Sequence, residues 1–171
     1  MAAYKEMAVG VKDPERAKIV AATGEQISQY DQAFGQIVAT EKQKTQTIKG
    51  LAETGVALQK TVADIMDAAT KDNQIEIVML ASKLQTQLLN GRYLGLRYVL
   101  TRQRTDFKKY QEEAITKVDA AFTTLEESSK GAYSALLKQF DNQHEGYHKL
   151  LPFLQEAVDK LNDLLYNGVY R

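Results

Sequence analysis

The sequence contains no cysteine, only two prolines among its 171 residues, and no excess of charge of either sign. The absence of cysteine excludes disulfide bonds, thiol catalysis and thiolate metal sites, and it is compatible with an oxidising compartment. Lysine and arginine number 22, and aspartate and glutamate also number 22, so the formal net charge is zero. General binding to nucleic acid or anionic membranes needs a basic excess, and we therefore expect no nucleic-acid partner.

Long apolar runs are missing as well. No stretch approaches the roughly 18 to 20 apolar residues that span a bilayer, and the first residues lack the apolar core of a signal peptide. Ten glycines, two prolines and 44% hydrophobic residues are typical of a folded chain with few turns. The length suits one ordinary domain or one elongated bundle.

An apolar stripe in alternating steps of four and three residues runs through the first half of the chain. Its 3.5-residue period is a heptad seam, which predicts a helix that packs against partners along its length. Asp13 and Pro14 are typical of an N-cap followed by proline in the first turn, so we expect this helix over 14–70. Glu41 and Lys44 interrupt the stripe with charge, and we interpret them as a wetter junction between modules. The stripe comprises Thr23, Ile27, Tyr30, Phe34, Ile37, Glu41, Lys44, Ile48, Leu51, Gly55, Leu58, Val62, Ile65 and Ala69.

The same period predicts three further helices. Polar breaks at 70–73, 101–105 and 128–131 separate them, and Pro152 should bend the last helix locally or start a new turn. We therefore predict an all-α fold, an elongated up-down four-helix bundle with one very long helix extending beyond it. The seam positions are Ile77, Ala81, Leu84, Leu88, Gly91, Gly95 and Tyr98, then Phe107, Tyr110, Ala114, Val118, Ala121 and Leu125, then Leu136, Phe140, Gln143, Tyr147, Leu150, Leu154, Ala157, Leu161 and Leu164.

Three pieces of this pattern occur in a recognisable order. A helix with Tyr30 and Phe34 runs into a long charged stretch, a leucine-rich helix with spaced arginines covers 88–101, and a second helix is centred on Tyr147. The pattern resembles the extracytoplasmic sensor domains of bacterial chemoreceptors and sensor histidine kinases, in particular the helical bimodular type. The resemblance implies a small-molecule ligand, often an organic acid, bound between helices. It also implies a membrane-anchored full-length protein with this domain on the periplasmic side.

The resemblance and the helix lengths together predict a domain organisation. We interpret residues 1–44 as a helix extension that belongs to a membrane-proximal module, and 45–171 as the main four-helix bundle, so that the chain is a partial two-module sensor. The chain is shorter than a complete bimodular domain, and we expect N-terminal helices and both membrane segments to lie outside it. Because the later helices cover only half of the first one, we expect a homodimer, with a missing segment as the other source of packing partners.

Candidate ligand-binding residues lie on the second and fourth predicted helices. Four arginines fall between 92 and 104, and the planar guanidinium matches a carboxylate bidentately. The alternative is a solvated basic helix end that the helix dipole favours. Polar seam residues need hydrogen-bond partners, which a ligand or neighbouring side chains would supply. The predicted ligand site comprises Arg92, Arg97, Gln87, Gln143, Tyr147 and His148.

The segment 144–148 reads His-Glu-Gly-Tyr-His, which matches the zinc helix of many metalloproteases. Two histidines four residues apart share a helix face, and His144 and His148 are a weak alternative metal site, with Glu156, Asp159 or Asp163 as the third ligand. We find no strand to align a substrate, and Tyr147 on the seam is expected to turn both histidines toward the flank of the helix. We therefore predict no enzyme, no resident metal and no cofactor. The remaining alternative to a sensor is a structural or interaction protein with no small ligand.

Overall fold

The structure is a computed structural model that describes residues 12–168, and within this range it contains helices and no strand. The all-α prediction is confirmed. Parts of the predicted segments, residues 1–11 and 169–171, lie outside the described residues. No helix between 12 and 168 combines the length and the apolar character that a membrane span needs. The elements are α2 (Pro14–Lys71), α3 (Ile75–Thr101), α4 (Arg104–Gln111), η1 (Glu112–Thr116), α5 (Lys117–Ser129), α6 (Ser134–Asp163) and η2 (Leu164–Gly168).

The predicted start of the first helix is confirmed by its cap. Oδ1 of Asp13 accepts hydrogen bonds from the backbone N–H groups of Glu15 and Arg16, both at 3.0 Å. These donors have no partner inside the helix, so the carboxylate satisfies them and also favours the positive end of the helix dipole. From this cap α2 continues for 58 residues. It ends at a turn in which Asn73 has a left-handed backbone (φ 57°), where the sequence predicted a polar break.

The chain divides into two compact units. One comprises residues 43–159, and the other contains residues 12–42 together with 160–168. The observed boundary lies two residues before the predicted division between 44 and 45, and residues 160–168 group with the N-terminal unit. The unit of residues 43–159 is called the bundle below. It holds the C-terminal part of α2, then α3, the segment α4–η1–α5, and most of α6.

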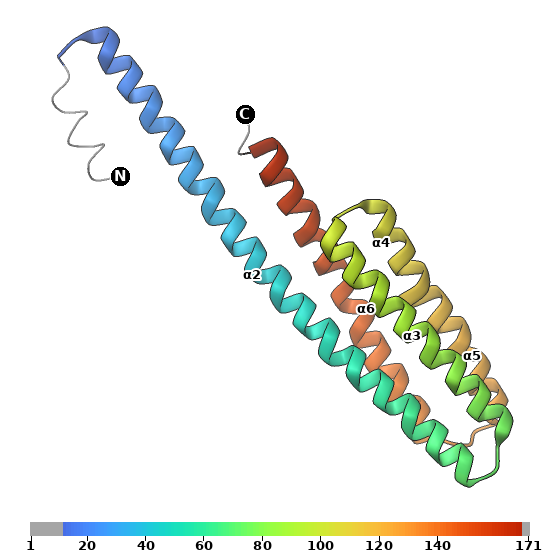
Figure 1. Cartoon of the computed structure of the whole chain (residues 1–171). Helices are drawn as coiled ribbons and strands as arrows, with labels where there is room; N and C mark the ends of the chain where they lie inside the picture. The colour runs from blue at the N-terminus through green and yellow to red at the C-terminus, as the bar shows by residue number, and fades with distance from the viewer. Residues whose placement is uncertain (1–11, 169–171) are drawn as a thin grey trace. The chain divides into compact units, whose positions relative to one another are not determined.

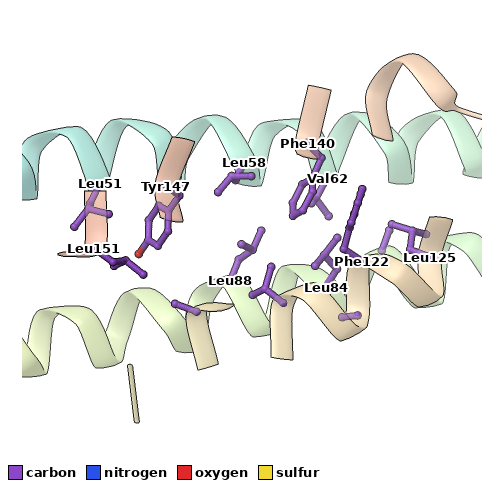
Figure 2. Packing of buried hydrophobic residues seen from close by; sticks show 14 of the residues in the cluster. Leu51, Leu58, Val62, Leu84, Leu88, Phe122, Leu125, Phe140, Tyr147 and Leu151 are labelled. Carbon is purple, nitrogen blue, oxygen red and sulfur yellow. The ribbon is translucent and has the colours of Figure 1, made fainter. Parts of the chain in front are cut away.

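The bundle is built around one apolar core. Helix α3 packs along α4, η1 and α5, which form a single uninterrupted helical segment (Figure 1). Side chains from α2, α3, α5 and α6 meet between the helices, and the rings of Phe122 and Phe140 stack with centroids 4.7 Å apart (Figure 2). Burial of such side chains is the main favourable term in folding. Core residues include Leu51, Leu58, Val62, Ile65, Ile77, Leu84, Leu88, Val118, Leu125, Leu151 and Leu154.

The buried stripe of α6 differs by one position from the predicted seam. Phe140, Tyr147, Leu154 and Leu161 are buried as predicted, whereas Leu136, Gln143 and Leu150 are only half-buried. The positions one residue after these three are buried in their place, namely Leu137, His144 and Leu151, and Val158 is buried beside the seam residue Ala157. The strict heptad reading was therefore too narrow, because a helix in a bundle contacts two neighbours and buries a wider stripe than a two-stranded seam.

Helix α6 also continues through Pro152, where the sequence predicted a local bend or a new turn. No new helix begins there. Pro152 is exposed to solvent. A proline removes one N–H from the helical ladder, and on an exposed face water can satisfy the carbonyl that loses its donor.

Helices α3 and η1 approach each other most closely at Gly91. A Cβ atom at position 91 would lie 2.9 Å from both the Cα and the Cβ of Ala114. Glycine is therefore required at this position by the backbone of the neighbouring segment. At Gly95, one turn later, an added Cβ would lie 3.0 Å from the ring of Tyr110. These two glycines explain how α3 and the α4–η1 segment pack at short distance.

We predict opposite effects for two glycine-to-alanine substitutions in helix interiors. Gly91→Ala should lower the free energy of unfolding by about 1–3 kcal/mol, because overpacking forces the backbones of α3 and η1 apart. Gly146→Ala should raise it by about 0.5–1 kcal/mol, because no atom lies within 4 Å of the added Cβ and alanine favours the helix. Urea unfolding of both variants checks this, and equal stabilities would contradict the close contact.

Candidate functional site

The side chain of Arg92 lies between α2 and α3, where a glycine of α2 leaves room for it. Its side chain is half-buried and crosses Gly55 of α2, where an added Cβ would lie 3.5 Å from the Cδ of Arg92. Nη1 of Arg92 donates a hydrogen bond of 2.9 Å to Oε1 of Gln59. Within residues 12–168 this is the one protein group that the guanidinium binds, and it has no carboxylate partner there. A guanidinium carries five N–H donors, so most of its donor capacity remains for water or a ligand.

A cavity of about 90 Å³ lies beside this arginine, and we call it the Arg92 pocket. Its walls come from α2, α3, α4 and α6 and are mostly aliphatic. Arg92, Tyr110 and Tyr147 are the residues with polar atoms on its wall. A second void of about 10 Å³ lies on the side of Arg92 and Tyr147 that faces His144. The lining residues of the pocket are Ile48, Leu51, Ala52, Arg92, Gly95, Leu96, Val99, Tyr110, Tyr147 and Leu154.

The two tyrosines of the pocket form a buried pair. The hydroxyl oxygens of Tyr110 and Tyr147 are 2.5 Å apart, so one hydroxyl donates a hydrogen bond to the other. Burial raises the pKa of both phenols above the usual value of 10.0. Both hydroxyls are therefore neutral at physiological pH. The pair places neutral hydrogen-bonding groups, and no negative charge, next to the Arg92 guanidinium.

The structure brings only part of the predicted ligand site together. Arg92 and Tyr147 line one pocket, as the helix register suggested. Arg97 points to another partner, because its Nη2 lies 3.1 Å from Oδ1 of the buried Asp106. Oε1 of Gln143 accepts a 2.9 Å hydrogen bond from the hydroxyl of Thr61 in α2, so this side chain is satisfied within the bundle.

Gln87 is half-buried on α3, and its Oε1 atom is buried without a hydrogen-bond partner among the described residues. The same holds for Nε2 of Gln59, the residue that binds Arg92 through its other amide atom. Buried polar atoms without partners are uncommon and are usually satisfied by an additional molecule such as water. Tyr110 and Gln59 were not predicted, although Tyr110 was placed on the seam; the contacts that bring them to Arg92 are long-range.

His148, the sixth predicted ligand residue, belongs to a different cluster. Its Nε2 lies 3.2 Å from Nε2 of His144 and 3.8 Å from Oδ1 of Asp119 on α5. Nδ1 of His144 lies 3.2 Å from the same carboxylate oxygen. We call Asp119, His144 and His148 the histidine cluster. His144 is buried, with 4% of its surface exposed, so the expectation that both histidines turn to the flank of α6 was wrong for His144.

The acidic member of the cluster was not predicted. None of the acids proposed from the sequence, Glu156, Asp159 and Asp163, belongs to it among the described residues. Asp159 instead pairs with Arg104 at 3.5 Å. Asp119 follows Val118 of the predicted seam, so the periodicity placed it beside the core. It could not show that Asp119 of α5 meets the two histidines of α6.

Burial also sets the charge of His144. Removal from water lowers the pKa of its imidazole, while the carbonyl of Ala114 and the carboxylates of Asp119 and Asp141 oppose this effect. Nε2 of His144 lies 3.2 Å from the carbonyl oxygen of Ala114, the middle residue of η1. The lowered pKa favours the neutral ring, which carries one N–H.

Another hollow lies at the other end of the bundle. It has a volume of about 570 Å³ and is formed by the α2–α3 and α5–α6 turns. Asp72, Glu76 and Lys130 line it, and the hydroxyl of Tyr133 donates a 2.9 Å hydrogen bond to Asp72 across the two turns. Its charged lining residues are exposed to solvent, so it resembles a surface groove between loops.

No protein-family model and no curated protein matches this chain.

We predict a pH-dependent role in stability for Asp106. The Thr101 hydroxyl, which donates a 2.6 Å hydrogen bond, and then the Arg97 guanidinium hold the pKa of this carboxyl below its usual value of 3.8. A depressed pKa stabilises the folded state above the unfolded-state pKa, and the benefit is lost as the pH falls through the folded-state pKa. Asp106→Asn should therefore lower the free energy of unfolding at pH 7 and have a shrinking effect below about pH 4.

Urea unfolding of the wild type and this variant at pH 7, 5 and 3 measures the difference. Glu126→Asn, at an exposed position of α5, is the control. It also replaces a carboxylate with an amide, but away from the Asp106–Arg97 pair. A pH-independent effect of Asp106→Asn would contradict the assigned charge interaction.

Proposed function

We propose that the bundle is a sensing domain that binds a small organic acid in the Arg92 pocket. The observation that carries this proposal is a half-buried guanidinium at the wall of an apolar cavity, with no carboxylate partner in the part of the chain that the structure describes. An ionic hydrogen bond from arginine to a carboxylate strengthens where water is excluded. The neutral tyrosine pair supports the binding of an anion, because it adds hydrogen-bonding groups without adding negative charge.

The volume of the pocket limits the ligand. A cavity of about 90 Å³ corresponds to about three water molecules in the liquid. The carboxylate would bind to Arg92, and a short apolar tail would lie among Leu51, Val99 and Leu154. We therefore propose a monocarboxylate of two or three carbons as the ligand class.

The resemblance of the sequence pattern to bacterial sensor domains agrees with this proposal. In such domains a ligand bound between helices produces a small helix displacement that is passed across the membrane. Here the ligand would touch four helices of the bundle at once, which would allow its binding to change their packing. The extracytoplasmic location and the anchoring of the full-length protein to a membrane are parts of the same proposal.

Carboxylate binding is the measurement that tests the proposed site. We expect saturable binding of acetate and propionate by calorimetry at constant ionic strength, and no binding of propionamide, which has the same shape without the charge. About 1.5 kcal/mol per non-hydrogen atom is the upper limit for small ligands, so the Kd of four-atom acetate should be no tighter than about 40 µM. Arg92→Gln should weaken binding by about 10- to 100-fold, because it removes a charged hydrogen bond.

Arg104→Gln is the matched control. It removes a guanidinium from the same end of the bundle, but Arg104 is 80% exposed and pairs with Asp159 outside the pocket. The control should bind propionate as the wild type does. If no acid binds the wild type up to tens of millimolar, or if both variants lose binding equally, the pocket is not an acid site. The structural or interaction role predicted as the alternative would then be favoured.

We further propose that the partner of the N-terminal part of α2 is a second copy of the chain. The heptad stripe continues there through Tyr30 and Phe34, which are 56% and 55% exposed and whose rings stack on each other at 6.3 Å. A 3.5-residue apolar period is maintained along a helix that packs against another helix. Two aromatic side chains of this exposure would bury substantial apolar area in a dimer.

Light scattering after size-exclusion chromatography should therefore give the mass of a dimer. The double substitution Tyr30→Ser and Phe34→Ser should yield a monomer with unchanged helix content. Exposed Gln29→Ser and Gln32→Ser on the same helix is the control pair and should remain dimeric. A monomeric wild type at all concentrations tested would overturn the dimer and leave the acid-binding proposal unaffected.

A further inference from the structure

We propose that Asp119, His144 and His148 form a binding site for a divalent transition-metal ion, with zinc as the best match, that links α5 to α6. One possible ligand atom from each residue lies within 4.8 Å of the others. The three groups come from two helices, and among residues 12–168 their salt bridges are to one another. The site goes beyond the proposed acid pocket and involves different side chains from those that would bind the acid.

The spacing of the ligand atoms fits a small tetrahedral ion. Zinc binds imidazole nitrogen and carboxylate oxygen at about 2.0–2.2 Å, which places neighbouring ligand atoms of a tetrahedron roughly 3.3–3.5 Å apart. Nδ1 of His144 lies 3.2 Å and Nε2 of His148 lies 3.8 Å from Oδ1 of Asp119. One ligand atom from each of the three residues lies within 4.8 Å of the others, so side-chain movement would bring them to coordination distance of one ion.

The hydrogen-bond inventory of His144 indicates where the ion would bind. The ring has close acceptors on both sides, the carbonyl of Ala114 at Nε2 and the carboxylate of Asp119 at Nδ1, each at 3.2 Å. A neutral imidazole has one N–H and can serve only one of them. If Nε2 donates to Ala114, the Nδ1 lone pair faces the carboxylate, and a cation between these two atoms turns a repulsive contact into coordination.

The contact of the other ring nitrogen of His144 supports the same position for the ion. Histidines that bind metals usually donate their other N–H to a backbone carbonyl or a carboxylate, which fixes the ring orientation. The carbonyl of Ala114 has this position and belongs to the π-helical turn η1. Irregular π turns in helices occur frequently at functional sites. Here a carbonyl of the turn faces the buried histidine.

The chemistry of the ligand set selects the class of ion. Two imidazoles and one carboxylate suit zinc, cobalt, nickel or copper, whereas calcium and magnesium prefer sites built from oxygen ligands. His148 and Asp119 are 32% and 51% exposed, so the remaining coordination position would be filled by water. Glu145 of the His-Glu-x-x-His segment does not join the site. It is exposed and pairs with Lys149 at 2.8 Å, so the segment does not place its glutamate as the base of a metalloprotease.

Zinc and cobalt binding to the tag-free chain tests the site. We expect one zinc ion per chain by calorimetry, and visible absorption typical of tetrahedral cobalt(II) when cobalt is added. His148→Gln and Asp119→Asn should each weaken zinc binding by at least about tenfold, since even a second-shell change costs a metal site that much. Both residues are partly exposed, so neither variant should unfold the bundle. A saturating concentration of zinc should raise the melting temperature of the wild type by several degrees, and of neither variant.

Glu145→Gln is the matched control, because it changes the literal metalloprotease motif without touching a proposed ligand. It should bind zinc as tightly as the wild type. The proposal is overturned if the wild type binds no zinc at millimolar concentration, if His148→Gln and Asp119→Asn bind it unchanged, or if Glu145→Gln loses binding to the same extent. Circular dichroism of each variant separates loss of a ligand from loss of the fold.

Discussion

The close contact between Gly91 and Ala114 is the constraint on which both candidate sites depend. Because residue 91 has no side chain, α3 lies directly against η1, and any Cβ there would meet the backbone of Ala114 at 2.9 Å. The next residue, Arg92, is thereby directed toward α2 and the cavity beside it. On the other side of the contact, the carbonyl of Ala114 meets His144 at 3.2 Å. One missing side chain thus positions a guanidinium and orients an imidazole.

The polar groups of the bundle differ in whether another residue of the chain supplies their hydrogen-bond or charge partner. Asp106 is buried but has two partners, the Thr101 hydroxyl and the Arg97 guanidinium, so its charge is compensated inside the fold. Gln143 is satisfied by Thr61 in the same way. Arg92 is different, because the hydrogen-bond partner of its guanidinium among residues 12–168 is a neutral amide. Buried or half-buried charge without a counter-charge is energetically costly, which is why such groups tend to mark binding sites.

In the histidine cluster, hydrogen bonds do not satisfy every short contact between the side chains. Its three groups are all capable of accepting a hydrogen bond or a metal ion, and the protons available on neutral rings do not satisfy every short contact. Under the two proposals, the Arg92 pocket would bind an anion and the histidine cluster would bind a cation. Tyr147 and Arg92 line the small void that His144 also lines, so the two sites are neighbours within one bundle. Their opposite charge requirements mean that they would bind chemically distinct partners.

Heptad periodicity determined the all-α fold and the greater part of the core, and residue types determined the Asp13 cap and the turn at 70–73, since heptad spacing and capping are local properties of a helix. The periodicity also placed Arg92 and Tyr147 on facing helices. Only the tertiary structure decided that Arg97 turns to Asp106, that His144 is buried in place of Gln143, and that Asp119 completes the cluster. The physical reason is that a sequence repeat defines which face of a helix is buried. Which residues contact the edges of that face depends on the rotation and spacing of the neighbouring helices.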